Sequence, residues 1–176
     1  STTAIFYSIS ATQKGLRGVS FGNFLLKRVI DDLKRDFPKL RTFATLSPIP
    51  GLARWLKARA EDDSRVTALL AAASAGSDEL RDHDEALREL TAHYLAQEKR
   101  QDGLPLDPVA RFHLGNGARL DNIHTFADLS ANGRRNAHGL MVNYLYDLGR
   151  LDRHRAMLAE GKTALSREVM RLAQLG

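Results

Sequence analysis

A glycine-bearing stretch near the amino terminus has the residue types that could bind a phosphate group. It comprises Gln13, Lys14, Gly15, Leu16, Arg17 and Gly18, and it lies between a predicted strand and a predicted helix. A helix amino terminus offers unpaired N–H groups and the positive end of the helix dipole, and glycines let a phosphate approach the backbone closely. Because the stretch lacks the Gly-Lys-Ser/Thr ending of a P-loop, its spacing favours a pyrophosphate site and a plain tight connection about equally.

Ser47 is a second candidate, because it opens the rigid sequence Ser47-Pro48-Ile49-Pro50-Gly51 directly after a predicted strand. Ligands of open parallel sheets bind outside the carboxyl ends of the strands, so a serine at this point could contact a substrate. A serine before proline is also a common turn or helix-cap residue. The position of this serine alone does not decide between the two roles.

His113 is a third candidate, in the sequence His113-Leu114-Gly115-Asn116-Gly117. Its imidazole can donate or accept a proton near neutral pH, which is what acid or base catalysis requires. None of the six histidines has the spacing of a metal site, and the chain contains no cysteine. We therefore predict no metal site, and a cysteine nucleophile is excluded.

The hydrophobic pattern predicts an α/β frame that would hold these candidates. Residues 4–10 and 41–46 are rich in β-branched and aromatic residues and predict two strands. Between them, apolar residues at helical spacing over 23–37 predict a helix that Pro38 ends. A strand, a helix and a strand in this order predict two parallel strands joined by a right-handed crossover. A short helix is predicted over 52–60.

The rest of the chain predicts helices around one further strand. Residues 61–102 are rich in helix-forming residues and predict two helices separated at 74–78. The glycines of residues 112–120 predict a structured loop with strand at its edges. Aromatic and aliphatic residues over 139–148 predict a final strand, and residues 151–176 predict one or two closing helices.

The composition indicates one globular domain with a positive net charge. Of its 176 residues, 43% are hydrophobic and 27% are charged, which is typical of a folded protein. The net charge of +5 favours anionic partners. Its cations are dispersed and no aromatic-basic motif occurs, so no nucleic-acid partner is predicted. No apolar stretch approaches the roughly 20 residues that span a bilayer, so no membrane partner is predicted either.

Several of these stretches occur together in an order that resembles the malonyl-CoA decarboxylase family. The resemblance covers most of the chain and is weakest over 61–102. It is carried by Phe6-Tyr7-Ser8-Ile9-Ser10, Thr12-Gln13-Lys14-Gly15-Leu16-Arg17-Gly18-Val19, Leu46-Ser47-Pro48-Ile49-Pro50-Gly51, His113-Leu114-Gly115-Asn116-Gly117-Ala118 and Gly139-Leu140-Met141-Val142-Asn143-Tyr144-Leu145-Tyr146.

The resemblance implies decarboxylation of malonyl-CoA to acetyl-CoA and carbon dioxide through a stabilised thioester enolate. No cofactor is implied, because coenzyme A is part of the substrate. A CoA-dependent acyltransferase of the same fold is the alternative. The resemblance also implies the site residues: Ser47 and His113 for catalysis with Tyr146 and Ser8 in support, and Gln13, Lys14, Gly15, Leu16, Arg17 and Gly18 for CoA binding.

The fold that the resemblance implies is α/β, an acetyltransferase-like (GNAT-like) mixed sheet whose strand-loop-helix-strand unit binds CoA. The chain would be the carboxyl-terminal part of the catalytic domain, residues 1–176, with a helical insertion over about 61–102 and closing helices over 151–176. Family members carry a helical domain and further strands before the point where this chain begins. We therefore expect a piece of a longer chain, whose partners include the rest of the catalytic domain and the helical domain.

The family resemblance finally implies an assembly and a location. It implies a homo-oligomer, which is cytoplasmic in a bacterium and organellar in eukaryotic relatives. One position departs from the family pattern, because Ser20 stands where animal relatives have glutamate. A carboxylate role at this position cannot be carried over.

Overall fold

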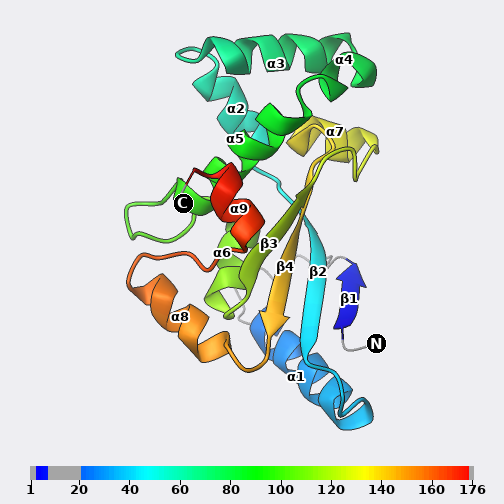
Figure 1. Ribbon diagram of the computed structural model, residues 1–176, viewed down its shortest axis with the longest axis vertical. Coiled ribbons are helices and arrows are strands. Elements are labelled where there is room, and N and C mark those ends of the chain that lie inside the picture. The colour runs from blue at the N-terminus through cyan, green and yellow to red at the C-terminus, as the bar shows by residue number, and fades with distance from the viewer. Residues whose placement is uncertain (1–2, 8–20, 175–176) are drawn as a thin grey trace.

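The chain forms a four-stranded mixed sheet flanked by helices, and the computed structural model describes residues 3–7 and 21–174 (Figure 1). The strands stand in the order β1-β2-β4-β3 across the sheet. Their bounds are Thr3–Tyr7 for β1, Thr42–Pro48 for β2, Arg119–His124 for β3 and Met141–Asp147 for β4. The expected α/β class is confirmed.

The first unit of the fold is β1, helix α1 (Phe21–Asp36) and β2. The two strands pair in parallel from Thr3 opposite Thr42 to Tyr7 opposite Leu46, which confirms the predicted parallel pair. Leu26 and Ile30 are buried one helical turn apart, as the apolar spacing predicts. Of the predicted strand over 4–10, residues 8–10 lie outside the described residues.

One face of the sheet is buried more deeply than the other. In β4, residues 142, 144 and 146 are buried, whereas the residues between them are only half-buried. Opposite residues of antiparallel strands share a face, so Thr45 faces the same side as Tyr144, and Phe43 the same side as Tyr146. Helix α6 (Pro108–Gly115) packs on this face, because its His113 ring stacks on Tyr144. This face carries the functional candidates.

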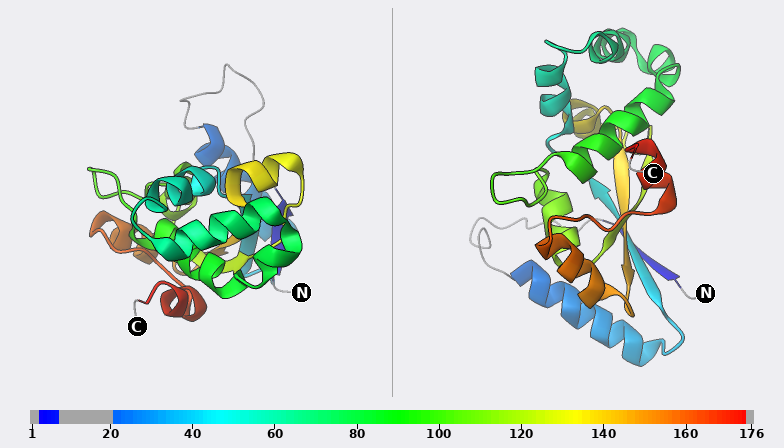
Figure 2. Two further views of the ribbon diagram at one scale, coloured as in Figure 1. Left: turned by 90° about the horizontal axis from the view of Figure 1, so that it is seen from above. Right: turned by 60° about the vertical axis from the view of Figure 1, so that its left-hand side comes forward.

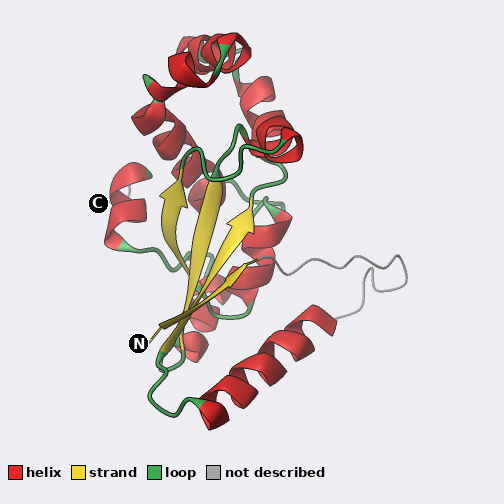
Figure 3. Cartoon of the chain, turned by 90° about the vertical axis from the view of Figure 1, so that its right-hand side faces the viewer, coloured by secondary structure: helices red, strands yellow, loops and turns green. Residues whose placement is uncertain are grey.

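The helices between β2 and β3 correct one prediction. Residues 61–102 hold three helices rather than two, and the bounds are Ser64–Ala75 for α3, Ser77–Arg81 for α4 and Asp84–Gln97 for α5. The predicted break is present at Gly76, whose φ of +154° favours glycine. A further break at Asp82 and His83 escaped prediction because neither residue is a strong helix breaker. Helices α3 and α4 lie at the end of the molecule remote from α1 (Figure 3).

The predicted loop over 112–120 is wrong at its start, because residues 112–115 lie in α6, whereas the strand predicted at its edge is confirmed by β3, which begins at Arg119. The local reason is the pair Asp107-Pro108, which caps and begins a helix. The glycines that suggested a loop end this helix instead, and Gly117, at φ +89°, lies directly against the Leu151 backbone. Strand β3 extends beyond the predicted edge to His124, and helix α7 (Ala131–Ala137) was not predicted.

The short helix predicted over 52–60 is confirmed as α2 (Leu52–Arg59), and the final strand predicted over 139–148 is confirmed as β4. Closing helices are also present, as α8 (Leu151–Ala159) and α9 (Arg167–Leu172). Helices α1 and α8 lie together at one end of the sheet (Figure 2). Within the described ranges, no helix combines the length and the apolar character needed to cross a membrane.

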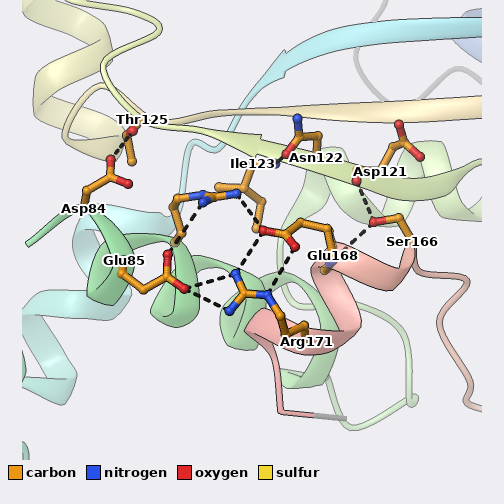
Figure 4. A network of polar contacts seen from close by, with 11 residues as sticks. Asp84, Glu85, Asp121, Asn122, Ile123, Thr125, Ser166, Glu168 and Arg171 are labelled. Atoms are coloured by element: carbon orange, nitrogen blue, oxygen red, sulfur yellow. Dashed lines mark hydrogen bonds and ion pairs between the residues drawn. The ribbon is translucent and has the colours of Figure 1, made fainter. Parts of the chain in front are cut away.

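An exposed set of charges ties α9 to α5, and we call it the α5–α9 ion network. Arg88 donates to Glu168 at 3.0 Å, and Arg171 donates to Glu85 at 3.0 Å (Figure 4). Ser166 caps α9 and also donates to the Asp121 carbonyl of β3 at 2.6 Å. The network and the Ser166 contact thus hold helix α9 against helix α5 and strand β3.

Candidate active site

Helix α6 and the buried face of the sheet bring together three of the predicted catalytic side chains. The Ser47 Oγ lies 3.2 Å from the His113 Nε2, and the Tyr146 hydroxyl lies 2.6 Å from the His113 Nδ1. All three residues are buried, with exposed fractions of 5% for Ser47, 3% for His113 and 1% for Tyr146. The fourth predicted side chain, Ser8, lies outside the described residues.

The strand β2 presents Ser47 to this site. Ser47 is the penultimate residue of β2, and Thr45, two residues earlier on the same face, lies 3.0 Å away between the two hydroxyl oxygens. Pro48 then ends the strand, because proline cannot continue a ladder of N–H donors. The strand end and the proline corner therefore hold the serine hydroxyl toward α6.

The helix α6 presents His113 from the opposite side. Asp107 caps this helix, and its Oδ2 accepts from the Val109 N–H at 3.0 Å and the Ala110 N–H at 2.9 Å. At the other end, the Asn116 side-chain amide donates to the Phe112 carbonyl at 2.8 Å. His113 thus lies in a short helix that is closed by side chains at both ends.

Three aromatic rings enclose the imidazole. Tyr144 stacks on it with ring centres 4.5 Å apart, and Phe112 meets it edge-on at 5.0 Å. Tyr146 also approaches edge-on, at 5.9 Å. Because these rings remove water, burial lowers the pKa of His113 from 6.5 to about 4. The imidazole is therefore neutral near pH 7.

The hydrogen bonds of the neutral imidazole have a definite direction. Burial raises the pKa of Tyr146 well above its usual value, so its phenol keeps its proton. Among the described residues this proton has no acceptor other than the Nδ1 of His113, so the phenol donates to Nδ1. A neutral imidazole carries one N–H, which must then be on Nε2 and points at the Ser47 oxygen. The Ser47 hydroxyl can consequently donate its own proton to Thr45 or to a ligand.

Several residues near the site escaped prediction from sequence. Asp107 is fully buried, and its neighbours include Tyr94 of α5 and Gly51. Burial, and next the charge of Asp107, raise the pKa of Tyr94 to about 12. The Asp-Pro pair before a helix was an available signal for Asp107 as a cap. No sequence signal could have found Tyr94, which lies in an ordinary helical pattern.

Two clefts adjoin the buried side chains. One, of about 220 Å³, lies between α1 and α8 and reaches Tyr146, and it carries Lys27, Lys34 and Arg155. The other, of about 400 Å³, adjoins the Pro50-Gly51 corner that follows Ser47. The second cleft is lined by Pro50, Gly51, Arg54, Trp55, Ala58, Tyr94, Leu106 and Pro108. Of the three clustered side chains, Tyr146 lines the first cleft, whereas Ser47 and His113 line neither.

The predicted CoA-binding residues belong to a stretch that the structure does not describe. Gln13, Lys14, Gly15, Leu16, Arg17 and Gly18 lie outside the described residues. Helix α1, which the sequence predicts to follow them, is present from Phe21 onward. Within residues 3–7 and 21–174, no group of three or more histidine, aspartate or glutamate side chains is arranged to hold a metal ion.

The chain is similar to known proteins over nearly its whole length. The family described as malonyl-CoA decarboxylase C-terminal domain matches residues 1–175. Mitochondrial malonyl-CoA decarboxylase of Mus musculus is 41% identical, over 82% of this chain and 35% of that protein. The protein of the same name from Anser anser anser is 38% identical, over 84% of this chain and 35% of its own length. The chain therefore spans about a third of the length of these curated relatives.

Solved structures carry the same similarity. The crystal structure of malonyl-CoA decarboxylase from Rhodopseudomonas palustris aligns with a TM-score of 0.87 and 46% identity, over 98% of this chain and 42% of that one. The structure of the protein of that name from Agrobacterium vitis also aligns at 0.87, with 43% identity, over 96% of this chain and 44% of that one. The fold and the sequence thus point to the same group of proteins.

Proposed function

The chain belongs to the malonyl-CoA decarboxylase family, and on this premise we propose that it carries the reaction centre of an enzyme that converts malonyl-CoA to acetyl-CoA and carbon dioxide. One observation carries the proposal within this chain. A neutral, buried imidazole is held between a serine and a tyrosine hydroxyl, 3.2 Å and 2.6 Å away. Such a site can hold or deliver one proton where water is excluded.

The proposed reaction needs a hydrogen-bond donor that stabilises the negative charge on the thioester oxygen. It also needs a proton that adds to the α-carbon. When the bond from the α-carbon to the carboxylate breaks, its electron pair delocalises onto the thioester oxygen as an enolate, and carbon dioxide leaves. One proton then adds to the α-carbon, so each turnover consumes one proton. A well-placed hydrogen-bond donor can stabilise such an oxyanion by about 3 to 4 kcal/mol. No electron-accepting cofactor is needed, because the thioester itself takes up the charge.

The direction of the hydrogen bonds supports a division of roles. We assign the proton-donating contact with substrate to Ser47, whose hydroxyl is free to donate while its oxygen accepts from His113. His113 then replaces the serine proton through Nε2–H, and Tyr146 replaces the histidine proton through its hydroxyl at Nδ1. In each step one O–H or N–H bond breaks as the next forms, and the phenolate left on Tyr146 then takes a proton from water, which is the one proton that each turnover consumes. The raised pKa of Tyr146 favours this return of the proton.

The topology supports the finer fold assignment as well. We propose an acetyltransferase-like (GNAT-like) core, because β1, α1 and β2 form a parallel unit and β4 and β3 follow it in antiparallel order. In this proposal Gln13 to Gly18 bind the CoA pyrophosphate ahead of α1, Ser8 supports the site, and residues 61–102 are an insertion. A homo-oligomer, cytoplasmic in a bacterium or organellar in a eukaryote, completes the proposal.

The activity is tested on the full-length protein that contains this chain. Malonyl-CoA labelled with ¹³C in its free carboxyl group is incubated with the protein, with and without added amines. We expect labelled carbon dioxide and acetyl-CoA in equal amounts, whether or not an amine is present. Transfer of the malonyl group to the amine, without carbon dioxide, would instead identify an acyltransferase. Release of labelled carbon dioxide by a Ser47→Ala variant at the wild-type rate would overturn the role assigned to the serine.

A further inference from the structure

Asp107 is buried far more completely than a helix cap needs to be. Its side chain is fully buried, and Oδ2 alone caps α6 by accepting from Val109 and Ala110. Asp63 performs the same task for α3 from a side chain that is 20% exposed, accepting from the Arg65 N–H at 3.0 Å. Since burying a carboxylate is costly, capping alone does not account for the position of Asp107.

The second oxygen of Asp107 faces the corner that follows Ser47. A Cβ added to Gly51 would lie 3.8 Å from Oδ1 of Asp107 and 2.3 Å from the Tyr94 hydroxyl. Burial raises the pKa of Asp107, while the N–H groups of Ala110, Val109 and Gly51 act in the opposite direction. One carboxyl group thus lies against both the helix that carries His113 and the corner that carries Ser47.

Tyr94 brings a third element to the same point. It comes from α5, and its hydroxyl fills the space that a side chain at position 51 would occupy. Its ring lies 5.2 Å from that of Trp55 in α2. Position 51 therefore requires glycine because there is no space for a side chain. The backbone conformation is not the reason, because its φ of −96° is open to any residue. Helix α5 thus contacts the corner that follows Ser47 through this tyrosine.

Two buried oxygens at this place are poorly satisfied. Within the described part of the chain, neither Oδ1 of Asp107 nor the Tyr144 hydroxyl makes a hydrogen bond of full geometry. Tyr144 is the residue whose ring stacks on His113 at 4.5 Å. Buried polar atoms without partners are rare because each is costly, and they concentrate where function maintains them. One of these two oxygens belongs to the ring stacked on His113, and the other belongs to the cap of the helix that carries His113.

We propose that Asp107 is a positioning residue that holds Ser47 and His113 at hydrogen-bonding distance, by joining the amino terminus of α6 to the Pro50-Gly51 corner with Tyr94 as a brace. It does not contact the substrate. The effect of Asp107 on catalysis can be measured only if the proposed decarboxylation is correct. Its effect on the geometry of His113 can be measured whether or not the protein decarboxylates malonyl-CoA. The two can therefore be tested separately.

The kinetic test uses Asp107→Asn in the full-length protein with malonyl-CoA. Asparagine keeps an oxygen that caps α6, but it places an uncharged amide nitrogen where a carboxylate oxygen faces the Gly51 corner and the Tyr94 hydroxyl. We expect kcat to fall about tenfold or more, because small misplacements of reacting groups are this costly, while KM stays within about twofold. Asp63→Asn is the matched control and should change neither. A folded Asp107→Asn enzyme with kcat within about twofold of wild type would overturn the proposal.

The structural test reads His113 without reference to activity. In protein labelled with ¹⁵N-histidine, wild type should show His113 as a single neutral tautomer with its proton on Nε2, and Asp107→Asn should show a mixture of tautomers. An unchanged His113 signal in this variant would reject the proposal even if no decarboxylation is detected. Should Asp107→Asn fail to fold, Tyr94→Phe removes only the bracing hydroxyl. It should lower kcat in the same direction, and unchanged kcat with an unchanged signal would also reject the proposal.

Discussion

Two regions of the molecule join segments that lie far apart in the chain: the cluster of Ser47, His113 and Tyr146, and the α5–α9 ion network. The first is buried and uncharged, whereas the second is largely exposed and charged. His113 is 3% exposed and its partners are neutral hydroxyls. In the ion network, the side chains of Arg171 and Glu85 are 55% and 51% exposed and carry full charges. A buried group cannot replace a lost partner with water, whereas an exposed charge can. The same substitution should therefore matter greatly in the first region and little in the second.

The largest effect is expected from His113→Gln. This change removes the imidazole from the proposed relay and takes away the Nδ1 acceptor of the Tyr146 hydroxyl. We expect kcat for malonyl-CoA to fall by about 10² to 10⁴, with a much smaller change in KM. The measurement is steady-state kinetics on the full-length enzyme, with His83→Gln as a control at a half-buried histidine outside the cluster. Equal kcat in both variants would place the reaction elsewhere.

The pH dependence of stability should show the same buried histidine. Because burial lowers the pKa of His113 from 6.5 to about 4, the unfolded chain binds a proton more readily over this interval. The stabilisation is thus complete above about pH 6.5 and is lost as the pH falls toward 4, on the order of 3 kcal/mol in total.

Urea unfolding between these pH values measures this effect. The free energy of unfolding should fall more steeply toward acid in wild type than in His113→Gln. The carboxylates contribute to both proteins alike and cancel in the difference. Parallel curves for the two proteins would contradict the burial of a neutral imidazole.

A smaller effect separates the two tyrosines of β4. Tyr146→Phe removes the donor to Nδ1 and leaves a buried acceptor unpaired, which should cost about 1 to 3 kcal/mol of unfolding free energy and lower kcat. Tyr144→Phe removes a hydroxyl that makes no hydrogen bond within the described residues, so stability should be unchanged or slightly raised. Thermal unfolding of the two variants measures this difference in stability. Equal losses would mean that both hydroxyls are satisfied in the folded protein.

The smallest effect is expected in the ion network. Arg171→Ala removes contacts to Glu85 and Glu168 that solvent and salt already weaken. We expect little change in unfolding free energy at physiological ionic strength, a difference that grows at low salt, and unchanged kcat. A large loss of stability that is independent of salt would remove the contrast between the two regions.

Much of the framework was predictable because local patterns encode it. The β-branched and aromatic residues around Phe43, and the apolar spacing that buries Leu26 and Ile30, are strand and helix signals that lie within a few residues of one another. The loop predicted around His113 was wrong because Asp107 and Pro108 begin a helix there, and Gly115 and Gly117 lie only at its end. The helix-starting pair at the beginning of this segment thus decided its structure, although the glycines at its end looked like the stronger signal.

The sequence by itself determined the candidate side chains Ser47, His113 and Tyr146 and the parallel unit that leads to the first of them. Only the tertiary structure decided that they meet, that the imidazole is neutral with its proton on Nε2, and that Asp107 lies between the start of α6 and the Gly51 corner. The physical reason is separation along the chain. Ser47 and His113 stand 66 residues apart, and His113 and Tyr146 stand 33 apart. Burial, pKa and hydrogen-bond direction depend on such distant neighbours, which no local pattern specifies.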